Sequence, residues 1–190
     1  MHGPREIETK FRVADRCALE SRLRALGAAG APPEAESNIL FDDAARSLRD
    51  SGCALRVRTV AGRGVLTFKG RAEVAAGVKS RVELESAVDD PASVAAVLEA
   101  LGYRAWFRYE KRRATWMFAD PSRPLVVVDE TPLGTFAEIE GPDAAVRALA
   151  KELGVAEAHF IAESYIALWL SAREKDPSLP EDMLFEDGRR

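Results

Sequence analysis

The most constraining feature of this sequence is a set of short segments in which charged side chains recur at every second position. The first segment, 5–13, reads Arg-Glu-Ile-Glu-Thr-Lys-Phe-Arg-Val. The same spacing recurs at Arg56/Arg58, Arg81/Glu83/Glu85, Lys111/Arg113 and Glu138/Glu140. Residues two apart in a β-strand share a face of the sheet. The spacing therefore predicts strands with one charged face and one apolar face.

Helical and turn signals fall between these strands. We predict strands over 5–13, 38–42, 53–60, 65–69, 79–86, 107–118, 125–130 and 135–140. Helices are predicted after the capping residues Asp15 and Asp90, after Gly141-Pro142, and over about 163–173 with Ser164 as the cap. Residues 30–37 have the composition of a loop. This order predicts one antiparallel α+β domain over 1–175, followed by a Pro-rich acidic tail over 176–190.

Composition excludes several classes of protein. The chain has 190 residues, 47% hydrophobic and 31% charged, so it is neither a disordered chain nor one with a membrane-spanning run. Its net charge of −4 argues against a surface built for nucleic acid. Glu6 and Glu8 stand where a signal peptide would be apolar. We expect Cys17 and Cys53 to be buried apolar residues without a disulfide, and we expect a cytoplasmic location with neither nucleic acid nor membrane as a partner.

The charged face has two interpretations, a solvated sheet surface or a binding site. A solvated face normally mixes in Ser, Thr, Asn and Gln, and like charges along one strand face repel each other. Basic pairs favour an anion with several charges, because Arg geometry suits phosphate oxygens. Carboxylate pairs favour a hard cation, Mg²⁺ or Mn²⁺. The two requirements together indicate a metal–polyphosphate ligand, and no P-loop motif offers another explanation.

The motif Glu6-Ile7-Glu8-Thr9-Lys10 resembles the N-terminal Glu-x-Glu-x-Lys signature of the CYTH superfamily, the triphosphate tunnel metalloenzymes. These include class IV adenylate cyclases, thiamine triphosphatases and inorganic tripolyphosphatases. The similarity continues in chain order, within residues 5–170, through 38–42, 54–58, 66–70, 81–85, 110–113, 128–130 and 133–140. The resemblance implies an eight-stranded antiparallel β-barrel with a charged tunnel inside and helices packed outside.

The resemblance also assigns roles to the charged residues of this sequence. It implies that metal is bound by Glu6, Glu8, Glu83, Glu85, Glu138 and Glu140, with Glu83 and Glu85 as candidates for a second ion. It implies that substrate is bound by Lys10, Arg56, Arg58, Lys69, Arg81, Lys111 and Arg113. Catalytic roles fall on Lys10 and Asp129, the latter as an acid that binds metal or orients a nucleophile.

The reaction has three alternatives. The sequences of residues 79–85 and 133–140 resemble those of class IV adenylate cyclases, which form cyclic AMP and pyrophosphate from ATP. A triphosphate hydrolase, acting on thiamine triphosphate or tripolyphosphate, is the alternative, and a non-catalytic polyphosphate or nucleotide sensor is the second. The expected partner is a triphosphate substrate, and formation of a homodimer stays open. We expect Met183-Leu184-Phe185 to pack on the barrel or to close one mouth of the tunnel.

Overall fold

Eight antiparallel strands close into a barrel in the computed structural model, which describes residues 3–186. The order around the barrel is β1 (Arg5–Arg12), β10 (Gly134–Glu140), β9 (Leu125–Thr131), β8 (Arg104–Phe118), β3 (Glu34–Asp42), β4 (Ala54–Val60), β5 (Arg63–Lys69) and β7 (Val78–Val88). A second pairing of β1, with β7, closes the ring. Two short strands lie off this ring, β2 (Ala28–Gly30) on β8 and β6 (Glu73–Ala75) on β7. The predicted barrel and α+β class are confirmed.

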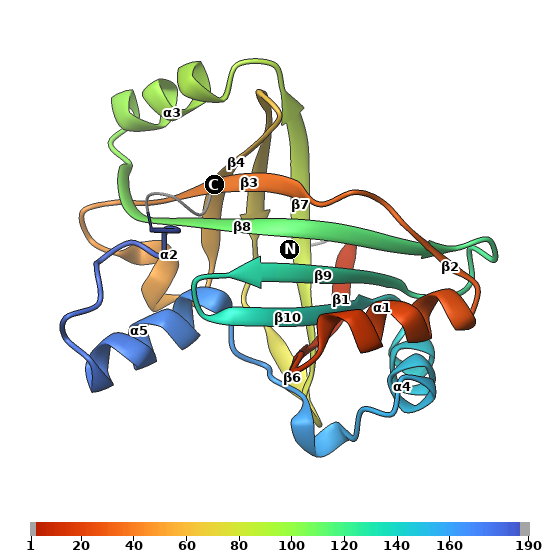
Figure 1. The fold of residues 1–190 in the computed structure, drawn as a ribbon. Helices are drawn as coiled ribbons and strands as arrows, with labels where there is room; N and C mark the ends of the chain where they lie inside the picture. Colours follow the sequence, from red (N-terminus) through yellow and green to blue (C-terminus); the bar gives the residue numbers. More distant parts are fainter. Residues whose placement is uncertain (1–2, 187–190) are drawn as a thin grey trace.

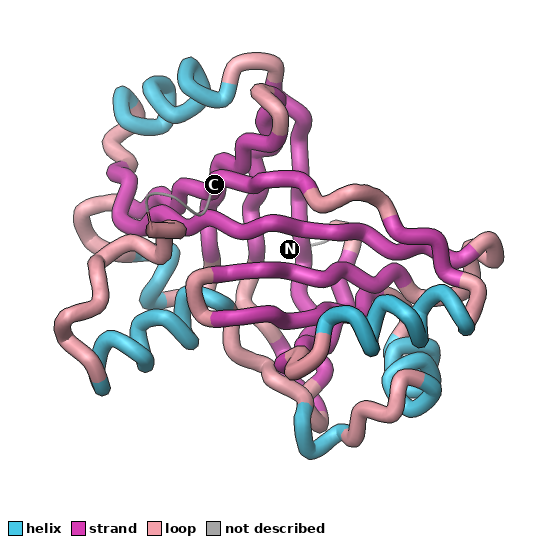
Figure 2. The backbone as a smooth tube through the Cα atoms, in the orientation of Figure 1, coloured by secondary structure: helices cyan, strands magenta, loops and turns pink. Residues whose placement is uncertain are grey.

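The strands cross at a steep angle. In Figure 1, β3, β8, β9 and β10 run across the view, and β4 and β7 stand nearly upright behind them. Figure 2 shows the strands gathered in one body, with the helices at its periphery. Because strand side chains alternate between faces, each barrel strand turns one face inward and presents the other to the helices.

Helices cover the apolar outer face of the barrel. Helices α1 (Arg16–Ala25) and α4 (Asp143–Glu152) bury Leu23, Val146 and Leu149 in one core with Val126 and Ile139 of the barrel. Helix α3 (Pro91–Ala100) buries Leu98 against Phe41 and Val57. Burial of apolar side chains on the outside leaves the barrel interior to the charged residues.

The predicted helix caps are confirmed. The Asp15 carboxylate accepts from the Ala18 backbone N–H at 3.0 Å, and Asp90 accepts from the Ala92 and Ser93 N–H groups. Ser164 accepts from the Ala167 N–H at 3.2 Å and begins helix α5 (Tyr165–Lys175). Each cap satisfies backbone donors that the first turn of a helix leaves free.

Helix α5 and the segment that follows it pack at one end of the barrel. Trp169 of α5 and Met183 are buried in one cluster with Phe107 and Phe136 of the strands. The Met183 N–H donates to the Arg108 carbonyl, and the Glu110 N–H donates to the Met183 carbonyl. The prediction that this apolar segment packs on the barrel is thus confirmed, while residues 187–190 of the predicted tail lie outside the described residues.

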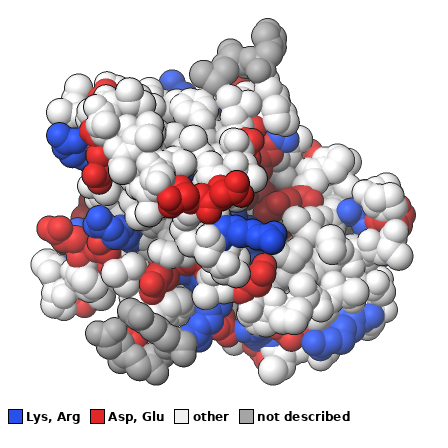
Figure 3. All heavy atoms as spheres, turned by 90° about the horizontal axis from the view of Figure 1, so that it is seen from above, with Lys and Arg blue, Asp and Glu red and all other residues white. Residues whose placement is uncertain are grey.

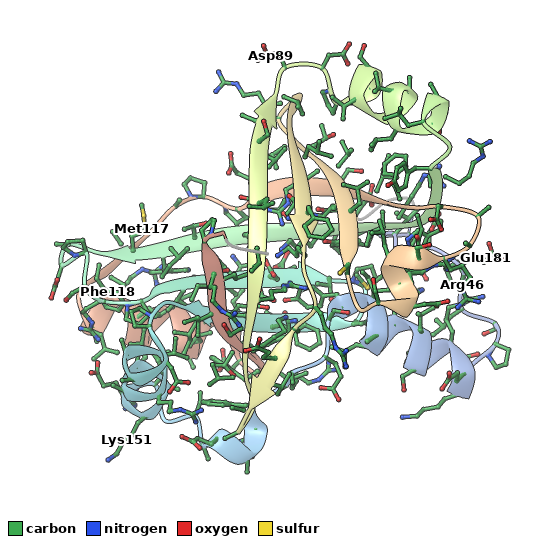
Figure 4. The ribbon with its side chains drawn as sticks, turned by 180° about the vertical axis from the view of Figure 1, so that it is seen from behind. Arg46, Asp89, Met117, Phe118, Lys151 and Glu181 are labelled. Atoms are coloured by element: carbon green, nitrogen blue, oxygen red, sulfur yellow. The ribbon has the colours of Figure 1, made fainter. Side chains whose placement is uncertain are left out.

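Different elements lie at the two ends of the long strand β8. Arg46 and Glu181, labelled in Figure 4, lie at the end that also carries α5 and the short helix α2 (Ser47–Asp50). Met117 and Phe118 lie at the opposite end, where β2 joins β8. The remaining helical element is a 3₁₀ turn over Glu157–His159. No helix in residues 3–186 has both the length and the apolar character needed to cross a membrane.

Two sequence predictions are wrong. Residues 30–37 are not a loop throughout, because β3 begins at Glu34 and pairs with β8 on one side and β4 on the other. Hydrogen-bonding neighbours on both sides hold this segment as a strand against its local composition. Cys17 is exposed, on the solvent side of α1, and Cys53 is only half-buried; both are free thiols.

Candidate metal and anion site in the barrel

Charged side chains line the interior of the barrel, around a cavity of about 1380 Å³. The basic side chains that line it from the strands include Lys10, Arg56, Arg58, Lys69, Lys79, Arg81, Lys111 and Arg113. The acidic side chains that line it from the strands include Glu6, Glu8, Glu83, Glu85, Glu138 and Glu140, with Glu36 and Asp129 packed against the basic ones. Lys10 and Lys111 are each 2% exposed and Asp129 is 0% exposed. Charges buried this deeply need partners of opposite sign.

Three of the predicted metal ligands converge in one place. Glu6, Glu8 and Glu140 each offer a carboxylate oxygen, and these oxygens lie within 4.8 Å of one another. We call these three residues the carboxylate cluster. It forms because β1 pairs with β10 and Glu8 lies directly opposite Glu140. Burial, together with the negative charges of Glu138, Glu8 and Glu6, raises the pKa of Glu140 to about 7 although Arg113 opposes the shift.

The carboxylate cluster fits a hard divalent cation. Its donors are all carboxylate oxygens, the ligands that Mg²⁺ and Mn²⁺ prefer, and they come from two adjacent strands that fix their positions. Glu6 is paired with Lys69 and Arg81, and Glu8 with Lys79, whereas the Arg113 guanidinium lies 3.7 Å from Glu140. A cation would offset the negative charge that remains at Glu140.

Asp129 is the centre of a second group, in which the negative charge is fully compensated. Arg113 grips its carboxylate with two hydrogen bonds of 2.7 Å, and Lys111 Nζ donates to it at 3.1 Å. Arg113 also donates to Glu138, whose other oxygen lies 3.1 Å from Lys10 Nζ. Burial alone would raise the pKa of Asp129, but Lys111 and Arg113 lower it below its usual value. We call Asp129, Lys111, Arg113, Glu138 and Lys10 the Asp129 cluster.

Tyr165 fixes the Asp129 cluster from the first turn of α5. Its hydroxyl donates to Asp129 at 2.8 Å, and its ring lies 4.1 Å below the ammonium of Lys10. Lys10 Nζ also donates to the Glu163 carbonyl at 3.1 Å. The start of α5 therefore closes on the tunnel and holds the orientation of two buried charges.

Arg56 belongs to a third group, on the far side of the barrel from β10. Its guanidinium donates to the Tyr109 hydroxyl at 3.2 Å and to Thr67 at 3.1 Å, and Thr67 in turn donates to Glu85 at 2.9 Å. Burial would raise the pKa of Tyr109, but the positive charges of Arg56, Lys111 and Arg58 outweigh it and lower the pKa to about 8. Arg58 donates to Asn38 at 3.2 Å.

The other predicted metal ligands lie against basic side chains. Glu83 accepts from Lys69 at 2.7 Å, Glu85 lies 3.5 Å from Arg56, and Glu138 is in the Asp129 cluster. Lys69 also donates to Glu6 at 3.1 Å, and Arg81 donates to Glu6 at 3.0 Å. A metal-binding role for Glu83, Glu85 and Glu138 stays a prediction.

Several residues of the interior were absent from the sequence-predicted site. They are Glu36, Asn38, Thr67, Lys79, Tyr109 and Tyr165. Lys79 and Tyr109 stand two positions before Arg81 and Lys111, so the alternation itself could have identified them. Glu36 was hidden by the loop-like composition around it. Lys79 is paired with Glu8, and burial lowers the pKa of Lys79 in spite of that pairing.

The outer surface contrasts with this interior. On the face drawn in Figure 3, acidic and basic side chains are interspersed, and neither sign covers the face alone. The like-charge pairs of the strands line the barrel cavity instead, and the cavity is where a charged ligand would find charges of one sign close together.

The chain matches known proteins along most of its length. The CYTH domain family model matches residues 4–165. A protein of Methanocaldococcus jannaschii named "putative adenylate cyclase" is 26% identical over 135 residues, which are 71% of this chain and 75% of the relative.

Solved structures share the fold. A Vibrio parahaemolyticus protein, also titled a putative adenylate cyclase, superposes with a TM-score of 0.73 at 22% identity and covers 86% of this chain and 97% of its own. A putative adenylyl cyclase from Hippeastrum, described as having a dominant triphosphatase activity, superposes with a TM-score of 0.66 at 21% identity, covering 94% and 99%. The family model spans most of the described residues and the closed barrel is present, so this chain belongs to the CYTH domain family.

Proposed function

We propose that this protein is a metal-dependent enzyme that acts on a nucleoside triphosphate or another organic triphosphate inside the barrel. The observation that carries this proposal is the meeting, in one cavity, of the carboxylate cluster and a wall of buried basic side chains. The cluster suits a divalent cation and the basic wall suits phosphate oxygens. Membership of the CYTH family supports the same ligand.

Each part of the interior has a chemical task in this proposal. Glu6, Glu8 and Glu140 would hold the divalent cation, which supplies charge neutralisation and polarises phosphate oxygens when it is bound. Arg56, Arg58 and Lys69 line the cavity and would bind the phosphate chain. Phosphoryl chemistry depends mainly on such positioning and charge stabilisation, so a rigid wall of buried cations is what the reaction needs.

The two residues predicted to be catalytic have different surroundings. The ammonium of Lys10 faces the cavity between Glu138 and the Tyr165 ring, which suits contact with a phosphate oxygen. Asp129 already accepts hydrogen bonds from Arg113, Lys111 and Tyr165. We therefore assign Asp129 a positioning role: it holds Lys111 and Arg113 in place for the ligand.

The cavity supports an organic triphosphate better than an inorganic one. Its volume of about 1380 Å³ exceeds the usual size of a small-molecule pocket, roughly 300–1,000 Å³. Trp106, Ile166 and Leu170 add apolar surface to its lining. The guanidinium of Arg49 stacks on the Trp106 ring at 4.3 Å from its centroid. Such a surface suits an aromatic base or ring.

The names of the relatives support two different reactions, cyclisation and hydrolysis. The Methanocaldococcus and Vibrio proteins are named as cyclases, and for ATP this reaction yields cyclic AMP and pyrophosphate. The Hippeastrum protein favours hydrolysis as the alternative. Both reactions need the same grip on the triphosphate. Residues of the tunnel wall therefore support triphosphate chemistry in common, and the product distinguishes the two reactions.

The test is to incubate the purified protein separately with ATP, thiamine triphosphate and tripolyphosphate, each with Mg²⁺ or Mn²⁺ and each with chelator, and to resolve the products. Cyclic AMP with pyrophosphate supports the cyclase, and orthophosphate release supports the hydrolase. Binding without turnover of any substrate would contradict an enzymatic role and favour a polyphosphate sensor. The cytoplasmic location and the homodimer stay predictions.

A further inference from the structure

Glu36 is a buried carboxylate inside the barrel with an unusual environment. It lies on β3, is 6% exposed, and points among the basic side chains of β4 and β8. Its Oε2 atom has no hydrogen-bond partner. Among the buried carboxylate oxygens of residues 3–186, this atom alone is in that state. An unmatched buried oxygen is costly, so its surroundings need an explanation.

Three cations surround Glu36 without bonding to it. Its Oε2 lies 3.3 Å from Arg58 Nε and 3.4 Å from Lys111 Nζ, and its Oε1 lies 4.0 Å from Arg113 Nε. The hydrogen bonds that these cations donate go to other acceptors. Arg58 donates to Asn38, while Lys111 and Arg113 donate to Asp129. Glu36 is therefore held by charge attraction alone.

The surrounding positive charges nevertheless favour the ionised carboxylate. Burial alone would raise the pKa of Glu36, but the positive charges of Lys111, Arg58 and Arg113 lower it below its usual value. A phosphate oxygen that approached Arg58 or Lys111 would come close to this negative charge. Because Glu36 is buried, like charges at such a separation repel more strongly there than in bulk water.

We propose that Glu36 is an internal counter-anion that competes with phosphate oxygens for Arg58, Lys111 and Arg113 and so limits the affinity of the barrel for free polyphosphate. This inference rests on the proposed function, because it concerns the anion that the same cavity binds. A polyphosphate that carries a divalent cation brings less negative charge and is repelled less. Glu36 thus favours metal-complexed ligands over free polyanions.

The experiment compares Glu36→Gln with Glu34→Gln, an exposed glutamate two residues earlier on the same strand. Calorimetry measures the dissociation constant of inorganic tripolyphosphate in chelator at fixed ionic strength. We expect Glu36→Gln to bind about tenfold more tightly than the wild type, and Glu34→Gln to stay within about twofold, since only the buried charge is close to the ligand. Loss of structure would weaken binding, so a gain in affinity is not a folding artefact.

Equal or weaker binding by Glu36→Gln would overturn the inference. A second variant, Glu36→Asp, keeps the charge and should stay near the wild-type affinity; a tenfold gain there would assign the effect to space and contradict the role of charge. With Mg²⁺ present, the gain in Glu36→Gln should be smaller than in chelator, and an equal gain would contradict the preference for metal-complexed ligands.

The outcome is separable from that of the proposed function. If the wild type binds tripolyphosphate but turns over no triphosphate, the enzymatic proposal fails, and tighter binding by Glu36→Gln still supports the counter-anion. If turnover occurs and Glu36→Gln binds no more tightly, the counter-anion fails alone. If neither protein binds tripolyphosphate, both are overturned.

Discussion

The carboxylate cluster and the Asp129 cluster lie in the same barrel but differ in how far their negative charge is balanced. Around Asp129, two cations and a tyrosine hydroxyl satisfy one carboxylate completely. Burial and the neighbouring carboxylates raise the pKa of Glu140 to about 7, although Lys69, Arg81 and Lys79 pair with Glu6 and Glu8. The Asp129 cluster is complete in the protein alone, whereas the carboxylate cluster would gain a counter-charge from a cation. The difference separates the part of the tunnel that positions side chains from the part that binds a cation.

The largest expected effect comes from removing a charge of the carboxylate cluster. We expect Glu6→Gln to reduce metal-dependent turnover by at least about a thousandfold, because the cation loses a ligand that defines its site. The fold should remain, since the substitution preserves shape. Steady-state assays with Mg²⁺ measure the effect, and Glu99→Gln on the exposed side of α3 is the control. Turnover retained in Glu6→Gln would remove Glu6 from the metal site.

The next effect concerns stability, and it should differ in sign between the two clusters. Asp129→Asn removes the carboxylate that Lys111 and Arg113 share and leaves their buried charge balanced only by Glu36 and Glu138. We expect this to lower the free energy of unfolding by about 3–5 kcal/mol. Glu140→Gln relieves repulsion among carboxylates, so in metal-free protein it should leave stability unchanged or raise it. Urea denaturation in chelator compares the two. Equal losses would show that the clusters do not differ in compensation.

A smaller effect, on ligand affinity, is expected when the Arg56 side chain is truncated. Arg56→Ala should weaken triphosphate binding by about 1.5–3 kcal/mol, the usual contribution of a charge-assisted contact. Arg63→Ala, at an exposed position on the same hairpin, should bind like the wild type. Calorimetry of the two variants with one triphosphate decides this, and unchanged affinity in Arg56→Ala would place Arg56 outside the ligand site.

The smallest effect is spectroscopic. The cations around Tyr109 lower its pKa to about 8, whereas an ordinary tyrosine has a pKa of about 10. In the ligand-free protein, one tyrosine should therefore ionise about two pH units earlier than usual. Tyrosinate absorbance during a pH titration measures this, and Tyr109→Phe should abolish the early step while Tyr103→Phe keeps it. The pKa of Tyr109 is lower in the folded protein than in the unfolded chain. The free energy of unfolding should therefore rise as the pH increases from about 8 to about 10, the ordinary pKa of tyrosine, and stay level above it. An early step that survives in Tyr109→Phe would contradict the assignment.

Much of the barrel could be predicted because its strands repeat a period of two. The alternation at Glu6, Glu8 and Lys10 identifies a strand with one charged face, and the resemblance to CYTH proteins correctly implied that this face turns inward. The strand at Glu34 could not be predicted from local composition, since it is held by its two neighbours in the sheet. Glu36 was missed for that reason.

The division of the acids into groups also lay beyond the sequence. Glu140 joins Glu6 and Glu8 because β10 pairs with β1 in a particular register. Residues 79–82 of β7 also lie opposite β1, but Glu83 and Glu85 extend past its start and lie opposite Lys69 and Thr67 of β5. Residue type and spacing are the same in the two Glu-x-Glu pairs. Both pairs contact basic side chains, but strand register brings only Glu6 and Glu8 close to a third carboxylate, Glu140.

The most direct test of this account is a calorimetric titration of Mn²⁺ into chelator-treated protein, with the wild type, Glu140→Gln and Glu85→Gln measured side by side. The account predicts that Glu140→Gln weakens Mn²⁺ binding at least tenfold, because it removes a ligand from the carboxylate cluster. Glu85→Gln should bind Mn²⁺ like the wild type, since Glu85 lies outside the carboxylate cluster, against Arg56 and Thr67. Undiminished binding in Glu140→Gln, or a loss confined to Glu85→Gln, would contradict the account.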